Sequence, residues 1–174
     1  MGWLAALASL IRPRDIITKM NIRETALKIV DYIRLGGTVF VIGNGGSAAG
    51  SQHFVAELIG RYKLKRKALP AIALTTDTSV LTAIGNDFGF EDIFTRQLEG
   101  LAKKGDILLT LSTSGTSKNI LRAIQFAERN GLKVISLPTN KALGKTTSET
   151  QEVHLKILHK LAGLIEKEFI NEKT

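Results

Sequence analysis

The feature that most constrains the fold of this chain is a short apolar run that ends in a glycine-rich turn, within residues 38–58. The β-branched and apolar residues at 38–42 predict a buried strand, and a helix is expected after the turn. The glycines of the turn, among them Gly45 and Gly46, tolerate backbone angles that other residues resist, so the turn can present its N–H groups outward. Ser47 is a candidate cap for the helix, whose N-terminus carries partial positive charge. The stretch therefore predicts a site for a phosphate group.

The helix after the turn carries a histidine and a glutamate four positions apart. His53 and Glu57 fall on one face of this helix. Such a pair is also common on solvated helix faces, and a glycine turn can be only a tight connection between a strand and a helix. A phosphate-binding turn close to a histidine–glutamate pair nevertheless favours an enzyme that acts on a phosphorylated small molecule.

The length and composition set further bounds. The 174 residues suffice for one domain with a substantial core, and the absence of cysteine excludes disulfides and thiolate metal sites. No apolar run reaches the roughly 20 residues that span a bilayer. The apolar start at 1–10 lacks a basic leader, so we interpret it as the beginning of an amphipathic helix rather than a signal peptide. We therefore expect a cytoplasmic protein with no membrane partner.

The formal net charge of +8 raises the question of nucleic-acid binding. The basic residues are spread along the chain except for a cluster at 61–67. That cluster follows the end of a predicted helix, where cations favour the helix dipole. A solvated loop, or a rim that attracts an anionic substrate, is the better interpretation, and nucleic acid is not expected as a partner.

Strand and helix patterns alternate along most of the chain. Residues up to about 36 are expected to form an N-terminal helical segment of one or two helices. The alternation downstream predicts a parallel sheet covered by helices on both faces, and the ends of its first and third strands should meet at the carboxyl edge, where α/β proteins bind ligands. Strands are expected at 38–42, 71–74, 107–111 and 132–137, and helices at 79–84, 91–102, 120–130 and 148–168.

A second candidate phosphate site follows the strand expected at 107–111. Hydroxyl side chains crowd the turn before the next helix, where backbone N–H groups are also available. Together such groups can surround a phosphate without any full positive charge. The alternative is a Ser/Thr-rich turn that only caps the helix, but the density of hydroxyls favours phosphate. The residues concerned are Ser112, Thr113, Ser114, Thr116 and Ser117.

The last predicted helix carries side chains that could complete a site with His53 and Glu57. Gln151 and His159 are eight positions apart, about two turns, and share a broad face of the helix. With His53 and Glu57 they offer nitrogen and oxygen ligands for a divalent metal ion, provided that the two helices meet. His154 falls on another face, and we interpret it as a surface or interface histidine.

Taken together, these motifs resemble the phosphoheptose isomerase family, which belongs to the sugar isomerase (SIS) domain group. The resemblance extends from about residue 20 to residue 170, and its matching segments are long and consecutive. They are Gly43-Asn44-Gly45-Gly46-Ser47-Ala48, Gln52-His53-Phe54 with Glu57-Leu58, residues 71–79, residues 81–87, Ser112-Thr113-Ser114-Gly115 and Gln151-Glu152-Val153-His154.

The resemblance implies a single SIS domain over residues 1–174, built as a flavodoxin-like three-layer α/β sandwich with a central parallel sheet. It implies an isomerase that converts sedoheptulose 7-phosphate to D-glycero-D-manno-heptose 7-phosphate through an enediol, for ADP-heptose and lipopolysaccharide core synthesis. It also implies one zinc ion per subunit and a homotetramer with active sites at the subunit contacts. The apolar residues at 3–10 could be buried in such a contact, or could pack within one chain.

Carried onto this chain residue by residue, the resemblance implies roles for the residues singled out above. The chemistry of the isomerisation also fits these side chains: we assign Glu57 as the base and His159 as the acid, and we expect the substrate to displace one of them from the metal. The implied zinc ligands are His53, Glu57, Gln151 and His159. The implied phosphate ligands are Ser47, Ser112, Thr113, Ser114 and Ser117, and sugar hydroxyls would lie near Asn44, Asp87 and Gln151.

The chain departs from the family pattern between residues 134 and 151, where a glycine-rich connection and a further strand are absent. Thr147 or Ser148 stands where family members often carry Asp or Thr near the substrate. An alternative function is a non-catalytic SIS protein that binds a replication initiator or senses a sugar phosphate. Relatives of the first kind lack the full histidine and glutamate set, which this chain retains, so the sequence favours the enzyme.

Overall fold

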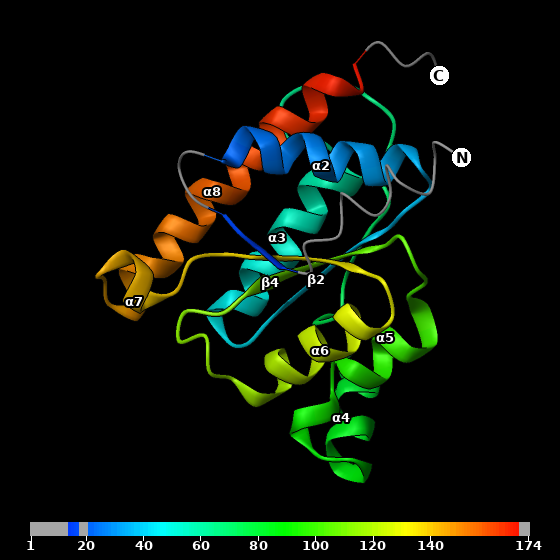
Figure 1. Cartoon of the computed structure of the whole chain (residues 1–174), viewed down its shortest axis with the longest axis vertical. Coiled ribbons are helices and arrows are strands. Elements are labelled where there is room, and N and C mark those ends of the chain that lie inside the picture. Colours follow the sequence, from blue (N-terminus) through cyan, green and yellow to red (C-terminus); the bar gives the residue numbers. More distant parts are fainter. Residues whose placement is uncertain (1–13, 18–20, 171–174) are drawn as a thin grey trace.

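The computed structural model describes residues 14–17 and 21–170, and its centre is a five-stranded sheet (Figure 1). The strand order is β1-β5-β4-β2-β3, and every neighbouring pair is parallel. The predicted parallel sheet is therefore confirmed. The strands are β1 (Arg14–Ile16), β2 (Val39–Gly43), β3 (Ala71–Ala73), β4 (Ile107–Leu111) and β5 (Lys133–Ser136).

Helices cover both faces of this sheet, as expected for a three-layer sandwich. The helices α2 (Ile22–Arg34), α3 (Gly46–Ile59) and α8 (Thr147–Glu168) pack together on one face. The other face carries α5 (Thr95–Leu101), α6 (Lys118–Arg129) and the short 3-10 helix η1 (Phe90–Asp92). Two further helices, α4 (Thr78–Asp87) and α7 (Asn140–Leu143), complete the described elements.

The central strands are buried on both faces because each face meets a helical layer. Val39 and Val41 of β2 join the hydrophobic cluster under α2, α3 and α8, whereas Phe40 and Ile42 join the cluster under α5 and α6. Successive side chains of a strand point to opposite faces, so a strand in this position must be apolar at every residue. This is why the continuous run at 38–42 was a reliable strand signal.

The N-terminal segment contains a strand where only helices were expected. α2 confirms one helix, but residues 14–16 form β1, which pairs with β5 in the register Arg14↔Val134 and Ile16↔Ser136. Without β1, β5 would present an edge of unpaired backbone groups. A three-residue strand carries no periodicity, so tertiary pairing decides it. The helix expected at 1–10 lies outside the described residues.

The connection between β5 and α8 is short in the structure too. Residues 137–146 contain α7 and no strand, and β1 takes the edge position beside β5. α8 then starts with a capping box, in which the Thr146 hydroxyl and the Glu149 carboxylate each bond the other's backbone N–H. The Thr146 hydrogen bonds also lower the pKa of Glu149. A strong local start signal therefore fixes where α8 begins.

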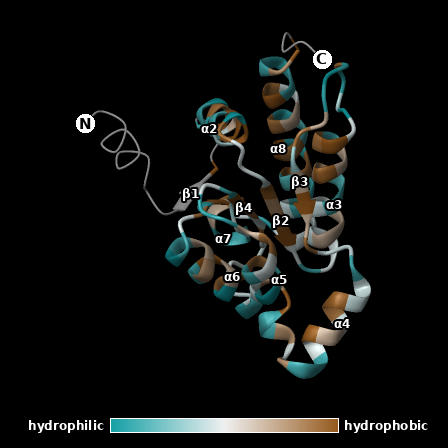
Figure 2. Ribbon diagram, turned by 90° about the vertical axis from the view of Figure 1, so that its right-hand side faces the viewer, coloured by the Kyte–Doolittle hydropathy of each residue, from teal (hydrophilic) through white to brown (hydrophobic). Residues whose placement is uncertain are grey.

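α4 differs from the other long helices in its burial. None of its residues is buried, and it projects from the body of the molecule (Figure 2). The helix expected at 91–102 is split into η1 and α5. None of the described helices combines the length and apolar character needed to cross a membrane.

Candidate active site

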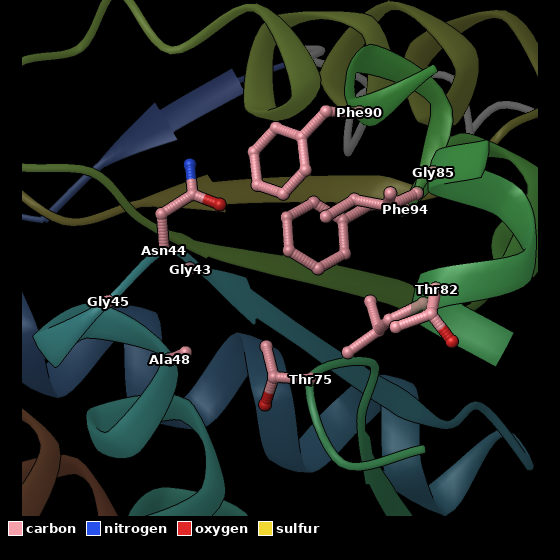
Figure 3. A pocket seen from close by; sticks show the side chains of 11 residues that line it. Gly43, Asn44, Gly45, Ala48, Thr75, Thr82, Gly85, Phe90 and Phe94 are labelled. Atoms are coloured by element: carbon pink, nitrogen blue, oxygen red, sulfur yellow. The ribbon is translucent and has the colours of Figure 1, made fainter. Parts of the chain in front are cut away.

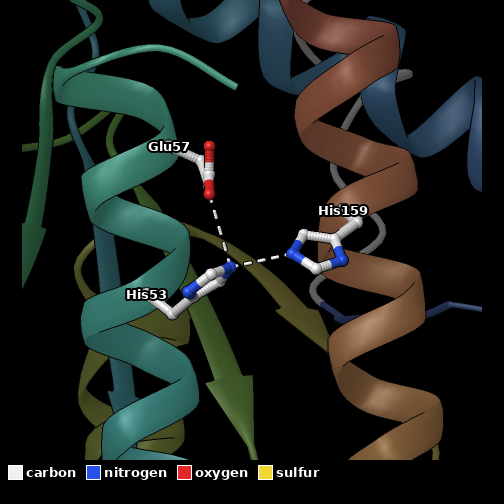
Figure 4. A group of neighbouring side chains, drawn as sticks. All are labelled: His53, Glu57 and His159. Atoms are coloured by element: carbon white, nitrogen blue, oxygen red, sulfur yellow. Dashed lines mark hydrogen bonds and ion pairs between the residues drawn. The ribbon is translucent and has the colours of Figure 1, made fainter. Parts of the chain in front are cut away.

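Two helices of the same layer bring together three of the four predicted metal ligands (Figure 4). His53 and Glu57 project from α3, and His159 projects from α8 toward them. The Nε2 atoms of the two histidines lie 2.8 Å apart, and Nε2 of His53 lies 3.4 Å from Oε1 of Glu57. One ligand atom from each of the three lies within 4.8 Å of the others. The convergence that the sequence could only suppose is therefore present.

The two imidazoles hydrogen-bond each other through like atoms. When both rings are neutral, one Nε2 carries the proton and the other accepts it, which requires opposite tautomers. The side chains of His53 and Glu57 keep 41% and 18% of their surface exposed. A solute can therefore reach the cluster from outside.

The donor set fits a zinc ion. Zinc takes imidazole nitrogen and carboxylate oxygen at about 2.0–2.1 Å in tetrahedral geometry, which separates neighbouring ligand atoms by about 3.3 Å. The 3.4 Å between His53 and Glu57 matches that spacing. The 2.8 Å between the histidines is shorter, as a hydrogen bond requires. Without sulfur ligands, the cluster also suits other divalent ions of intermediate character.

The fourth predicted ligand, Gln151, has a different neighbour. Its side-chain amide lies against Gly46 in the first turn of α3, and a Cβ added to Gly46 would stand 2.7 Å from Nε2 of Gln151. Gly46 is seven residues before His53, which is about 10 Å along a helix axis. A side chain at position 46 would require this amide to move. The structure therefore joins Gln151 to the glycine turn, and its place among the metal ligands stays a prediction.

His154 is not the surface residue that we predicted. Its side chain is 2% exposed, and Nε2 hydrogen-bonds the carbonyl of Pro138 at 2.7 Å. Burial lowers the pKa of the imidazole, and the hydrogen bond to the Pro138 carbonyl acts in the opposite direction. The prediction failed because the connection after β5 folds over this face of α8, which helical spacing alone does not show.

The glycine turn has the predicted path, but Ser47 does not cap the helix. Gly45, at φ +54°, is the N-cap residue, and Ser47 lies inside the first turn and is buried. At Gly43 an added Cβ would stand 2.6 Å from the carbonyl oxygen of Ser47, so strand and helix approach too closely for a side chain. The backbone N–H of Ser47 bonds the carbonyl of Asn44. The turn therefore depends on glycine for both its path and its tightness.

An amide pair that the sequence reasoning missed ties this turn to the first turn of α6. Asn44 and Asn119 exchange two side-chain hydrogen bonds, of 2.9 and 2.8 Å. Asn119 is 2% exposed, and its Oδ1 also accepts the N–H of Ile120. The only sequence signal was an amide next to the hydroxyl-rich turn. The predicted meeting of the two strand ends is confirmed, since β2 and β4 are adjacent.

The hydroxyl-rich loop is largely bonded to itself. Ser112 Oγ accepts the N–H of Gly115, Ser114 Oγ accepts the N–H of Thr116, and the carbonyl of Thr113 accepts the N–H of Asn140. Ser117 is the N-cap residue of α6 but makes no side-chain cap hydrogen bond. Each accepting hydroxyl retains a proton to donate. The loop can therefore offer hydroxyl donors to an anion, and its predicted role in binding phosphate stays a prediction.

The lysine that follows this loop in the sequence is already paired. Lys118 bonds Glu91 at 2.9 Å, and Arg122 bonds both Glu91 and Asp92 at 2.8 and 2.7 Å. These ion pairs lower the pKa of Glu91 and raise that of Arg122. They join α6 to η1. A phosphate at the loop would therefore meet hydroxyls and N–H groups rather than an unpaired ammonium.

A pocket of about 410 Å³ is lined by residues of the glycine turn, α4 and η1, among others (Figure 3). Asn44 and Gly45 line it, whereas Ser47, Asp87 and the hydroxyl-rich loop lie outside its lining. Asp87 instead ends α4 and accepts a hydrogen bond from Asn86. The remaining lining is mainly apolar: Gly43, Ala48, Thr75, Leu81, Thr82, Gly85, Phe90, Ile93 and Phe94. The sequence reasoning did not anticipate this pocket.

Comparison with known proteins shows which proteins this chain resembles in sequence. The SIS domain family matches residues 3–139. A phosphoheptose isomerase from Geotalea daltonii is 47% identical to the chain, and the match covers 83% of this chain and 82% of the relative. One from Akkermansia muciniphila is 44% identical, and the match covers 85% of each chain. Such relatives do not favour the alternative of a non-catalytic SIS protein.

Solved structures agree with the sequence relatives. A phosphoheptose isomerase from Francisella tularensis superposes with a TM-score of 0.77 at 34% identity, and one from Neisseria gonorrhoeae with 0.75 at 32%. In both cases the match covers 94% of this chain and 91% of the other. The chain therefore belongs to the phosphoheptose isomerase family, a family of sugar-phosphate isomerases built on the SIS domain.

Proposed function

We propose that this chain converts sedoheptulose 7-phosphate into D-glycero-D-manno-heptose 7-phosphate. The observation that carries the proposal is the convergence of His53, Glu57 and His159 on one point. These side chains supply a carboxylate and imidazoles, the groups that a ketose–aldose interconversion needs. The names of the relatives support a seven-carbon sugar phosphate as the substrate.

Zinc is the proposed cofactor, one ion per subunit. His53, Glu57 and His159 would hold it, and Gln151 is proposed as a fourth ligand on the sequence resemblance alone. When bound, zinc would polarise the substrate oxygens and stabilise the negative charge that develops on them. Because Glu57 and His159 also move protons in the proposal, substrate oxygens would displace one of them.

The proton transfers are assigned to two residues. Glu57 takes the proton from C1 of the ketose while His159 gives a proton to the C2 carbonyl oxygen, which forms the enediol. Glu57 then returns its proton to C2, and His159 takes the proton of the C1 hydroxyl, which leaves the aldose. Both residues end in their starting states, so the isomerisation consumes no oxidant or reductant.

The phosphate and the sugar hydroxyls are assigned to the two turns at the carboxyl edge of the sheet. We assign the phosphate to the hydroxyls of Ser112, Thr113, Ser114 and Ser117, and to Ser47 and the N–H groups of Gly45 and Gly46 as further donors. The loop supports this assignment because its hydroxyls retain protons to donate. Asn44, Asp87 and Gln151 are proposed for the sugar hydroxyls.

The oligomeric state, the pathway and the compartment are also part of the proposal. A homotetramer with active sites at its subunit interfaces would cover apolar side chains that one chain exposes, such as Leu35 and Leu101. The product would feed ADP-heptose and lipopolysaccharide core synthesis. A sugar phosphate is charged and does not cross a bilayer unaided, so we place the reaction in the cytoplasm.

Product analysis tests the proposal directly. The purified chain is incubated with sedoheptulose 7-phosphate, with and without a strong chelator, and the sugar phosphates are separated. We expect the heptose 7-phosphate to form only without chelator and to reappear when zinc is restored. Fructose 6-phosphate serves as a matched shorter ketose. Binding of the heptulose without turnover would favour a sensor, and turnover unaffected by chelator would remove the metal from the proposal.

A further inference from the structure

The loop after α3 places an aromatic ring on one of the clustered side chains. The ring of Tyr62 is stacked on the imidazole of His159, with centroids 5.3 Å apart and planes inclined by 18°. His53 meets the same imidazole edge-on, at 5.0 Å and 67°. Among the described residues, none hydrogen-bonds Nδ1 of His159. Contacts with two rings therefore hold this imidazole, and the reaction assigns no task to Tyr62.

α8 is shaped to accept the tyrosine ring. Gly163 follows His159 by one turn, and a Cβ added there would stand 3.3 Å from Cε1 and 3.5 Å from Cδ1 of Tyr62. Glycine is an unfavourable residue inside a helix of 22 residues. Here it leaves the space that the ring fills.

A buried carboxylate on the same stripe of α8 fixes the backbone next to Tyr62. Glu166 is 1% exposed, and its two oxygens accept the N–H of Lys63 at 3.1 Å. One of them also accepts the N–H of Leu64 at 3.2 Å. His159, Gly163 and Glu166 are spaced by four and three residues, so they share one face of the helix. A carboxylate buried this deeply must be hydrogen-bonded, and the loop backbone supplies the donors.

The other end of the loop is tied to α3. The guanidinium of Arg66 donates to the carbonyl oxygens of Glu57 and Leu58 at 2.6 and 2.7 Å. These carbonyls lie in the last turn of α3, where helix carbonyls lack partners within the helix. The loop thus joins the end of the helix that carries His53 and Glu57 to the helix that carries His159.

We propose that Tyr62 is a positioning residue for His159, and that Glu166 and Gly163 set the place of its ring. A metal-binding or proton-transferring imidazole needs a fixed ring plane, which a second hydrogen bond commonly provides. In this chain the stacked ring of Tyr62 fixes the plane of His159 in place of a second hydrogen bond. The inference rests on the proposed function for the role of His159 as metal ligand and acid, whereas the orientation of the imidazole is independent of it.

Four variants of the full chain test the inference. Tyr62→Phe keeps the ring and Tyr62→Ala removes it, while Glu166→Gln retains one acceptor oxygen. Phe88→Ala removes an exposed aromatic ring elsewhere and serves as the matched control. Thermal unfolding shows which variants keep the fold. If Tyr62→Ala does not fold, Tyr62→Leu replaces it, because leucine keeps apolar bulk without an aromatic ring current.

The first measurement is the NMR spectrum of the metal-free protein. The ring-proton signals of His159, identified by their loss in His159→Asn, should be shifted upfield by the stacked ring in the wild type and in Tyr62→Phe. They should move downfield in Tyr62→Ala and to an intermediate position in Glu166→Gln. The second measurement is zinc affinity by competition with a chromophoric chelator. We expect about a tenfold loss in Tyr62→Ala and less than about a twofold change in Tyr62→Phe and Phe88→Ala.

The outcomes separate this inference from the proposed function. Wild-type ring-proton shifts and wild-type zinc affinity in Tyr62→Ala would overturn the positioning role. A wild-type protein that does not bind zinc would refute the metal in the proposed function, and the NMR comparison would still decide whether the ring of Tyr62 is stacked on His159.

Discussion

The cluster of His53, Glu57 and His159 and the hydroxyl-rich loop at 112–117 belong to one candidate site, but different contacts hold them. Each clustered side chain is next in sequence to a core residue, since Phe54, Leu58 and Leu158 are 0–1% exposed. The positions of the three ligands therefore follow from helix packing. The loop has no comparable core residue between 112 and 117 and is held by hydrogen bonds within itself and to Asn140.

This difference indicates how the two regions respond to change. Close-packed interiors do not tolerate shifts in their backbones, so the ligand cluster is preorganised before any solute binds. A hydrogen-bonded surface loop opens at lower cost and can rearrange its hydroxyls around an anion. Substitutions in the cluster should therefore change the chemistry, and substitutions in the loop should change mainly substrate affinity.

The largest effect is expected from the proton-transferring residues. Glu57→Gln and His159→Asn should each lower kcat by about 10²–10⁴-fold, the usual contribution of general acid–base catalysis. Sugar-phosphate binding should survive, because the phosphate is held elsewhere. Steady-state kinetics and calorimetric binding would check this, with Glu99→Gln as a surface carboxylate control. Full activity of either variant would contradict the assignment.

The metal should contribute to stability through the cluster alone. A ligand present at 100 times its Kd stabilises the folded state by about 2.7 kcal/mol. Zinc should therefore raise the melting temperature of the wild type, and His53→Ala should lose that increase. A thermal melt with zinc and with chelator measures both. An equal zinc-dependent rise in His53→Ala would place the ion outside this cluster.

The Asn44–Asn119 amide pair should show an intermediate effect because it joins the glycine turn to the start of α6, which follows the hydroxyl-rich loop. Asn119→Ala leaves the amide of Asn44 unpaired, at a cost of about 1–3 kcal/mol in the free energy of unfolding. It should also raise KM, since the glycine turn loses its tie to the start of α6. Denaturant unfolding and kinetics of the variant test this, with Asn130→Ala, an exposed helix-end amide, as the control. An unchanged free energy of unfolding would show that the amide pair does not stabilise the fold.

The smallest effect on stability is expected in the loop itself. Ser117→Ala removes a hydroxyl that makes no cap hydrogen bond, so the free energy of unfolding should change by less than about 0.5 kcal/mol. KM for the sugar phosphate should rise about tenfold, the equivalent of one lost hydrogen bond to a charged group. Kinetics at saturating substrate should show an unchanged kcat. A lower kcat at constant KM would place this hydroxyl near the reacting carbons instead.

Much of the fold followed from local patterns that do not depend on distant contacts. The apolar run at 38–42 and the glycines after it predicted β2 and the tight turn, because strand burial and backbone freedom are properties of those residues themselves. β1 was missed for the opposite reason. A strand of three residues is fixed only by its partner β5, and no sequence pattern marks that pairing.

The candidate metal ligands were likewise predicted in part from local spacing and decided in part by tertiary packing. Helical spacing placed His53 beside Glu57, and Gln151 on the face of His159, because both are relations within one helix. Whether α3 and α8 meet, and at which level along their axes, depends on core packing across the whole layer.

The sequence by itself therefore determined the α/β class, the glycine turn and the chemical identity of the candidate ligands, all of which depend on neighbouring residues. Only the tertiary structure decided that His53, Glu57 and His159 meet, that Gln151 lies on Gly46 and that His154 is buried. It also brought Tyr62 and Asn119 into the site. The physical reason is that side chains on separate elements reach one another only through the close packing of the core that lies between them.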